Sequence, residues 1–338
     1  MVAPRNDKNK KGNAMTIHRI IRRAQLAAAV FSFVLAGTSA QAQQIEGCNS
    51  KDLSARFDEV SKTGKMPPEI GRWLMDPKAQ YIAPFKAFDN VSFVGICWVS
   101  AWIITTPEGA ILIDTLHTPH VDQLMRNIDS VGVKLSDIKY VFITHGHFDH
   151  AGGAAQLKPL LPNAKFVMTQ TGWDEAKASS AASQGTLRAW SMIPQDIVAS
   201  DGEAFRLGGE TIRVYATPGH TLGTASFAYD VKDDGKVLHA ITVGGLGLNA
   251  IENAKQVEGY IASVDRIEAM VKQPTDPVTV HLTTHPFATS LIEAGNALAA
   301  RKPGEPNPIV DPVAFTQQLD GLRSGAETRL AIEKKAGR

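Results

Sequence analysis

Four side chains of the kind that bind metals stand within six residues of one another, and this run constrains the chain more than any other feature. His145, His147, Asp149 and His150 follow the β-branched stretch 138–144 and precede Ala151-Gly152-Gly153. An extended segment points the first two rings to one side, and the glycines then release the chain into a helix. A catalytic zinc ion needs about three protein ligands, so four in one run predict two ions. The alternative is a solvated polar loop.

Two more histidines stand directly after apolar, strand-like segments. His220 lies in Thr217-Pro218-Gly219-His220-Thr221, and His285 lies in Thr283-Thr284-His285-Pro286. Taken alone, each is more often a surface or hydrogen-bonded histidine, but two ions need six ligands and these two residues complete the set. Asp114, at the end of a strand, is a candidate partner for a ligand imidazole or simply ends the strand. Outside the set, we interpret four histidines as structural, although the first two could line a pocket: His117, His120, His239 and His281.

The patterning around these residues alternates between strands and helices. Two apolar runs, 94–106 and 110–115, flank the turn Pro107-Glu108-Gly109 and predict a β-hairpin. Residues 121–131 have helical periodicity, and 138–144 read as a strand. The order recurs in a strand at 211–216, a helix at 257–271 and a strand at 278–284, and an amphipathic helix follows from Pro312 to about Lys334. The chain is therefore expected to be α/β (α+β), with two similar halves.

The first 42 residues read as a signal peptide. Arg19, Arg22 and Arg23 precede the apolar stretch 24–37, and Ala40-Gln41-Ala42 supplies a cleavage pattern, so the mature chain is expected to begin near Gln43. Translation could start at Met1 or at Met15. The apolar stretch is short for a bilayer span, and an uncleaved membrane anchor is the alternative. We therefore expect a periplasmic or secreted protein without stable membrane association.

Charge and cysteine content narrow the partners and the compartment. Residues 1–42 hold seven of the 35 Lys and Arg and one of the 34 Asp and Glu, so the remaining chain has a formal net charge of −5. This balance argues against nucleic acid as a partner. The chain has two cysteines, Cys48 and Cys97. In an oxidising compartment we expect them to form a disulfide, and two separate buried thiols are the alternative.

The histidine run, the Pro-Gly-His-Thr segment and the Thr-His-Pro segment together resemble the metallo-β-lactamase superfamily over about residues 85–290. The resemblance implies a four-layer αβ/βα sandwich over 85–338, preceded by an N-terminal extension at 43–84. It also implies two Zn²⁺ ions. His145, His147 and His220 would hold the first, and Asp149, His150 and His285 the second.

The segment 241–247 narrows the resemblance. Most hydrolases of the superfamily place a bridging Asp there, and two subclasses of the lactamases place a Cys, but here the segment reads Ile-Thr-Val-Gly-Gly-Leu-Gly. It resembles the third subclass of zinc β-lactamases, as do the cysteine pair and the tail 307–312. Members of that subclass often bind the substrate carboxylate with a Ser-x-Ser pair. Gly245 and Gly247 stand at those positions, so backbone N–H groups or Asn249 are the candidate substrate contacts.

Three functions follow from this reading. The leading one is hydrolysis of the amide bond of β-lactam antibiotics, hence antibiotic resistance, by a metal-bound hydroxide that Asp149 orients as the catalytic side chain. The second is hydrolysis of another cyclic ester or amide, as in a lactonase, and the glycines in place of Ser-x-Ser keep it open. The third is zinc-dependent binding without catalysis, which six retained ligands argue against. The expected partner is a small-molecule substrate, and we expect a monomer.

Overall fold

The computed structural model describes residues 47–63, 65–186 and 188–337. The predicted signal peptide lies outside these residues. Among the helices that are described, we find none with both the length and the apolar character needed to cross a bilayer.

The first sheet contains seven strands in sequence order, β1 to β7. Neighbours from β1 to β4 pair antiparallel, and those from β4 to β7 pair parallel. The predicted hairpin is present as β3 and β4, joined at the predicted turn. The strands are β1 (Phe85–Phe88), β2 (Val91–Phe93), β3 (Trp102–Thr106), β4 (Gly109–Ile113), β5 (Ile138–Phe142), β6 (Lys165–Met168) and β7 (Ile197–Val198).

The second sheet contains five strands in the order β12-β11-β10-β9-β8. All neighbours pair antiparallel except β11 and β12, which run parallel. The predicted strands at 211–216 and 278–284 correspond to β9 and β12. The strands are β8 (Ala204–Leu207), β9 (Glu210–Ala216), β10 (Ala225–Asp233), β11 (Lys236–Thr242) and β12 (Val278–His281).

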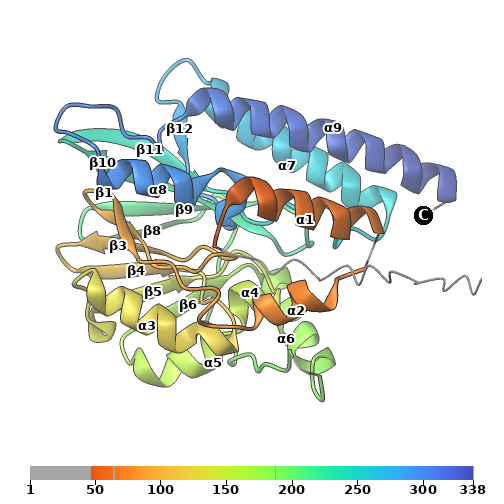
Figure 1. Ribbon diagram of the computed structural model, residues 1–338, viewed down its shortest axis with the longest axis horizontal. Coiled ribbons are helices and arrows are strands. Elements are labelled where there is room, and N and C mark those ends of the chain that lie inside the picture. Colours follow the sequence, from red (N-terminus) through yellow and green to blue (C-terminus); the bar gives the residue numbers. More distant parts are fainter. Residues whose placement is uncertain (1–46, 64, 187, 338) are drawn as a thin grey trace, which may run out of the picture. The chain divides into compact units, whose positions relative to one another are not determined.

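Helices cover the outer face of each sheet (Figure 1). On the first sheet these are α3 (Val121–Ser130), α5 (Ala154–Leu157) and α6 (Gln170–Ala182). On the second they are α7 (Ala254–Lys272) and α9 (Pro312–Ala336). The remaining helices are α1 (Ser50–Thr63), α2 (Pro68–Leu74), α4 (Phe148–Ala151), α8 (Leu291–Ala299) and the 3₁₀ turns η1 (Thr118–His120), η2 (Leu135–Asp137), η3 (Lys158–Leu160) and η4 (Pro286–Ala288).

Three apolar cores separate the four layers. Strand alternation divides β4, since Leu112 faces the helices on the first sheet while Ile111 and Ile113 face the second sheet. The third core lies between the second sheet and the long helices α7 and α9, and contains Val264 and Phe315. The predicted αβ/βα sandwich is confirmed.

The predicted N-terminal extension contributes α1 and α2 to this arrangement. Leu53, Ile70 and Trp73 are buried in the core that also holds Leu112. Residues 50–74 therefore pack as part of the sandwich, although they precede its first strand.

Several strand predictions extended too far, and among them β5 ends at Phe142 and β12 at His281. The apolar run 94–106 is a strand only from Trp102. Before it the chain reverses, since the Ile96 N–H donates to the Val99 carbonyl, and a Cβ on Gly95 would lie 2.5 Å from that oxygen. The segment 241–247 also leaves its sheet early, because β11 ends at Thr242. Gly244 then passes so close to Ala225 that a Cβ would lie 2.1 Å from the Ala225 carbonyl oxygen. Close backbone approaches of this kind leave no periodic pattern in the sequence.

Candidate metal centre

The six predicted ligands come from segments that follow the carboxyl ends of three strands. His145 and His147 follow β5, and α4 carries Asp149 and His150. His220 follows β9 and His285 follows β12. The two sheets thus bring residues up to 140 positions apart to one place, as the sequence predicts.

The first trio consists of His145, His147 and His220. The Nδ1 atom of His147 lies 3.1 Å from His145 Nε2 and 3.1 Å from His220 Nε2. All three ring nitrogens lie within 4.8 Å of one another. Three imidazoles that converge in this way present a set of nitrogen donors to a single point.

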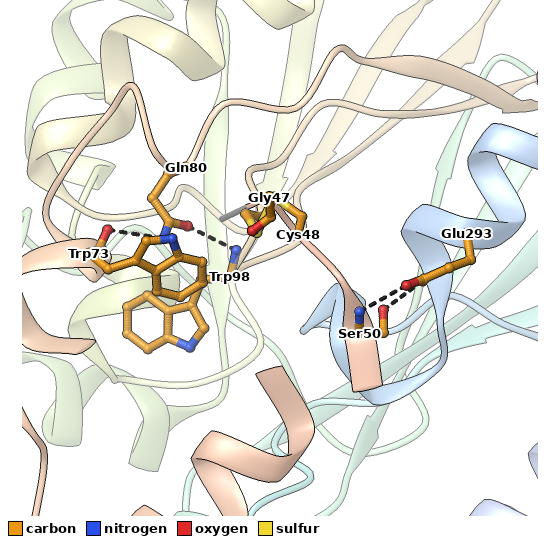
Figure 2. The surroundings of a disulfide bond; sticks show 8 residues. Gly47, Cys48, Ser50, Trp73, Gln80, Trp98 and Glu293 are labelled. Carbon is orange, nitrogen blue, oxygen red and sulfur yellow. Dashed lines mark hydrogen bonds between the residues drawn. A yellow bond between two sulfur atoms is a disulfide. The ribbon is translucent and has the colours of Figure 1, made fainter. Parts of the chain in front are cut away.

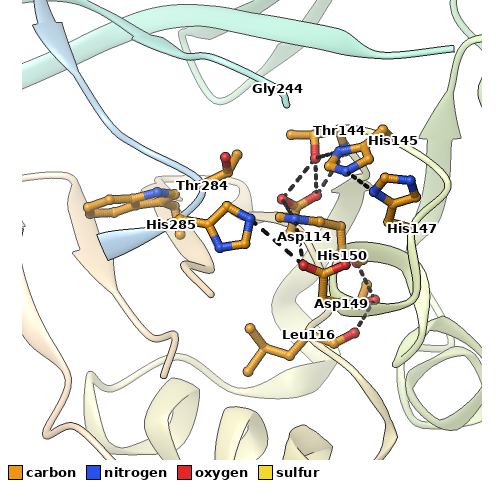
Figure 3. A network of polar contacts seen from close by, with 12 residues as sticks. Asp114, Leu116, Thr144, His145, His147, Asp149, His150, Gly244, Thr284 and His285 are labelled. Atoms are coloured by element: carbon orange, nitrogen blue, oxygen red, sulfur yellow. Dashed lines mark hydrogen bonds and ion pairs between the residues drawn. The ribbon is translucent and has the colours of Figure 1, made fainter. Parts of the chain in front are cut away.

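The second trio consists of Asp149, His150 and His285 (Figure 3). Asp149 Oδ2 lies 3.3 Å from His150 Nε2 and 3.8 Å from His285 Nε2. This trio therefore combines two nitrogen donors with one carboxylate oxygen.

Neighbouring oxygens determine which ring nitrogen three of the histidines offer. When an oxygen accepts a hydrogen bond from Nδ1–H of a neutral imidazole, Nε2 keeps its lone pair and can bind a cation. The acceptors are Asp114 Oδ2 for His150 (2.8 Å), the Gly247 carbonyl for His220 (2.6 Å) and the Trp98 carbonyl for His285 (2.8 Å). In each case the free Nε2 atom is the one that belongs to a trio.

Asp114 has the predicted role of a partner to a ligand imidazole. Besides His150 Nδ1–H, it accepts hydrogen bonds from the backbone N–H and the hydroxyl of Thr144. The Thr144 hydroxyl oxygen lies 3.0 Å from His145 Nδ1. The buried carboxylate thus orients one histidine of the second trio directly and one of the first trio through Thr144.

Burial keeps most of these imidazoles neutral. Desolvation, followed by the charge of His147, lowers the pKa of His220 to about 3. Desolvation, followed by the charge of His150, lowers the pKa of His285 to about 4. Burial alone would also lower the pKa of His150, but the Asp149 and Asp114 carboxylates outweigh it and raise this pKa to about 10. Without a cation, His150 therefore holds a second proton beside Asp149, and a metal ion that binds Nε2 would displace this proton.

This donor chemistry fits divalent metal ions. Neutral imidazole nitrogens and an ionised carboxylate are the forms that bind such cations, and four of the five imidazoles contact an oxygen with their other nitrogen. Asp149 is ionised because His150 and His285 hold its pKa far below the ordinary value, although burial opposes this.

A cavity of about 600 Å³ opens onto both trios. Four of the six predicted ligands line it: His147, Asp149, His220 and His285. Aromatic side chains form much of the remaining wall, namely Phe57, Trp98, Phe148 and Phe287. A concave, largely apolar site with a few converging polar groups is typical of small-molecule binding.

The predicted substrate contacts lie in different places. Gly247 and Asn249 line the cavity. Gly245 is not among its lining residues. It has a φ of +68° and packs against His220, where a Cβ would lie 2.5 Å from the His220 Cβ. Gly245 thus allows the loop to pass close to His220. Contact with the substrate remains a prediction for Gly247 and Asn249.

The predicted disulfide between Cys48 and Cys97 is present, directly before Trp98 in the chain (Figure 2). Gln80 holds the adjoining backbone on both sides, since its carbonyl accepts from the Cys97 N–H and its side chain accepts from the Trp98 N–H. The Trp98 carbonyl in turn accepts from His285. The bridge therefore anchors the N-terminal segment next to a residue that orients a candidate ligand.

The other histidines take structural positions. His117 and His120 are buried, and both approach the Leu74 carbonyl with Nε2. Neither lines the cavity. His239 lies on β11 and His281 ends β12, as their strand-like surroundings predict.

Several residues of the site have no signal in the sequence. Gln256, on α7, donates to the carbonyls of Gly219 and Ala250 and so fastens the His220 loop to the loop after β11. Phe57 reaches the cavity from the predicted extension, and Arg188 reaches it from the loop after α6. The position of each of these side chains depends on contacts between segments far apart in the sequence, which a local motif does not predict.

Comparison with known proteins agrees with this geometry. The Metallo-beta-lactamase superfamily matches residues 94–244, and the chain therefore contains a domain of that superfamily. The native FEZ-1 metallo-β-lactamase from Legionella gormanii is 27% identical, covers 75% of this chain and 98% of its own, and has a TM-score of 0.68. BJP-1, a subclass B3 metallo-β-lactamase of Bradyrhizobium japonicum, is 26% identical over 78% of this chain and 99% of its own, with a TM-score of 0.67.

Curated sequences give a different set of names. A hydroxyacylglutathione hydrolase of Rhodopseudomonas palustris (strain BisB5) is 30% identical over 137 residues, which are 40% of this chain. The match spans 45% of that relative's length. Proteins similar to this chain thus have names that refer to different substrates.

Proposed function

We propose that this protein hydrolyses the amide bond of β-lactams with two Zn²⁺ ions. His145, His147 and His220 would hold one ion, and Asp149, His150 and His285 the other. The proposal rests on the proteins of similar structure, which include a subclass B3 metallo-β-lactamase, and on the donor set.

One observation favours this function over others of the superfamily. The loop after β11 passes the centre at Gly245 and Gly247 and brings neither a carboxylate nor a thiolate to it. The two trios thus remain separate sets of three ligands. This is the arrangement that the resemblance associates with the third subclass of zinc β-lactamases.

The side chains of the cavity support hydrolysis. When bound, the two ions would supply Lewis acidity and lower the pKa of an attacking water. Asp149 is ionised and lines the cavity, so it can accept a hydrogen bond from that water and orient it. The aromatic wall offers apolar contact area to a substrate.

A second candidate is thioester hydrolysis. It is favoured by the curated relatives, which are hydroxyacylglutathione hydrolases. The glycines after β11 count against it, because most hydrolases of the superfamily are expected to carry a bridging Asp there.

Turnover by the zinc-loaded protein separates the candidates. We would measure kcat/KM for benzylpenicillin, a cephalosporin, a carbapenem, an acyl lactone and S-lactoylglutathione. The proposal expects hydrolysis of at least one β-lactam at a higher kcat/KM than the lactone and the thioester. Turnover of the lactone or the thioester without turnover of any β-lactam would contradict the proposal and favour that other substrate.

We also propose that the protein acts outside the cytoplasm. The Cys48–Cys97 bridge supports this, because disulfides persist in oxidising compartments. The mature N-terminus of the exported protein, expected near Gln43, tests the prediction directly.

A further inference from the structure

Arg188 places a positive charge at the cavity that opens onto the metal centre. It lies in the loop between α6 and β7 and lines the cavity together with His147 and Asp149. Its guanidinium carbon lies 5.3 Å from the centroid of the Phe148 ring, the residue directly before Asp149. Stacking on that ring restrains the guanidinium without using its N–H donors.

The charge of Arg188 has no acidic partner among the described residues. Four other described arginines do contact a carboxylate, namely Arg266 with Asp201, Arg301 with Asp233, Arg323 with Asp265 and Arg329 with Glu333. The five N–H donors of Arg188 are therefore available to a ligand, and a guanidinium fork suits a carboxylate.

The rest of the cavity complements this charge. Phe57 and Phe287 stack with their centroids 4.9 Å apart, and Trp98 continues the apolar wall toward Phe148. Gly247, at a position where relatives are expected to carry a serine, has no side-chain donor. The cavity thus offers an aromatic surface and a cation, but no hydroxyl pair on the loop after β11.

We propose that Arg188 binds the carboxylate of the substrate and thereby selects amphipathic anions that carry an aryl or other apolar group. The inference rests on the proposed function for the identity of the reaction, but it concerns binding and can be tested without turnover. Asp58, on α1, also lines the cavity and is acidic, so it disfavours an anion at its own side. The carboxylate is therefore expected beside Arg188.

Equilibrium binding of a matched pair of probes tests the inference. We would titrate 4-phenylbutyrate and its uncharged counterpart 4-phenylbutanol into the zinc-loaded protein by calorimetry. For Arg188→Gln we expect the carboxylate to bind about tenfold more weakly, which is the effect of one charge-assisted hydrogen bond, and the alcohol to change less than twofold. Arg188→Lys keeps the charge but not the two parallel N–H donors, and its affinity for the carboxylate should decrease less than that of Arg188→Gln.

Two control variants test whether the effect belongs to the charge at position 188. Arg126→Gln removes an exposed arginine of α3 that contacts Gln123, and should leave both affinities unchanged. Asp58→Asn removes the opposite charge at the cavity, and should leave carboxylate binding equal or tighter. Unchanged thermal unfolding of Arg188→Gln would show that the substitution leaves the overall fold intact.

The inference is overturned by any of three results. These are carboxylate binding by Arg188→Gln as tight as in the wild type, an equal loss for both probes, or a wild type that does not prefer the carboxylate. Failure of the proposed function has a different signature, namely no β-lactam turnover while the contrast between the probes remains. If β-lactams are hydrolysed, Arg188→Gln should raise KM for them and leave kcat nearly unchanged.

Discussion

Four of the five histidines of the candidate centre contact a neighbouring oxygen that orients the ring. Two of these oxygens are backbone carbonyls, from Gly247 and Trp98, which no side-chain substitution removes directly. Asp114 is different, because a single buried carboxylate orients His150 and also holds Thr144 beside His145. At the scale of single residues, we therefore expect substitution of Asp114 to disturb the orientation of the candidate ligands more than substitution of any other residue outside the two trios.

Asp114→Asn should weaken zinc binding about 10- to 100-fold. The amide oxygen can still accept from the Thr144 N–H, but its NH₂ group would face His150 Nδ1 and favour the wrong tautomer. Competition with a chelator measures the zinc dissociation constant. Asp122→Asn, at an exposed position of α3, is the matched control, and equal affinities for the two variants would contradict the assigned role of Asp114.

His147→Ala and His285→Ala should each reduce the zinc content of the dialysed protein by about one ion, since each removes one of about three ligands that an ion requires. The first variant affects the trio with His145 and His220, and the second the trio with Asp149 and His150. Elemental analysis provides the measurement, with His239→Ala on β11 as a control. Full metal content in both variants would show that the two trios do not hold metal.

At the scale of elements, local patterning predicts the regular structure well. The predicted helices at 121–131 and from Pro312 to about Lys334 correspond to α3 and α9, because apolar residues recur at helical spacing and Asp311 and Pro312 mark a helix start. The reversal at 96–99 and the cavity wall formed by α1 could not be predicted. Both depend on contacts that join distant segments, such as the Ser54 hydroxyl with the Phe287 carbonyl.

The Cys48–Cys97 bridge is expected to stabilise the N-terminal segment against detachment. It closes a loop with a sequence separation of 49, and loop-closure entropy for that length corresponds to about 4 kcal/mol as an upper value. Replacing both cysteines with alanine should lower the free energy of unfolding by about 2–4 kcal/mol in denaturant titrations. Reductant should destabilise the wild type similarly and leave the double variant unaffected; a reductant effect on that variant would point to another cause.

At the scale of the whole molecule, acid should destabilise the fold in two separate ranges of pH. Hydrogen bonds from Arg301 lower the pKa of Asp233, so that ion pair contributes stability above the unfolded pKa, which is about 3.9, and loses it as the pH falls further. His281 acts at higher pH. Burial, opposed by a hydrogen bond with Gln318, lowers its pKa to about 4, whereas the unfolded value is 6.5.

Between pH 6.5 and 4 the unfolded chain binds a proton at His281 that the folded protein does not bind. The free energy of unfolding therefore decreases as the pH is lowered through that range. The cumulative loss is about 3 kcal/mol for a difference of this size. His281→Gln keeps a donor toward Gln318 but cannot take up the proton. On acidification its free energy of unfolding should therefore decrease by about 3 kcal/mol less than that of the wild type. Denaturant unfolding at pH 7.5 and pH 4.5, with the same zinc concentration for both proteins, gives the difference. Parallel losses in the two proteins would show that His281 is protonated in the folded state as readily as in the unfolded chain.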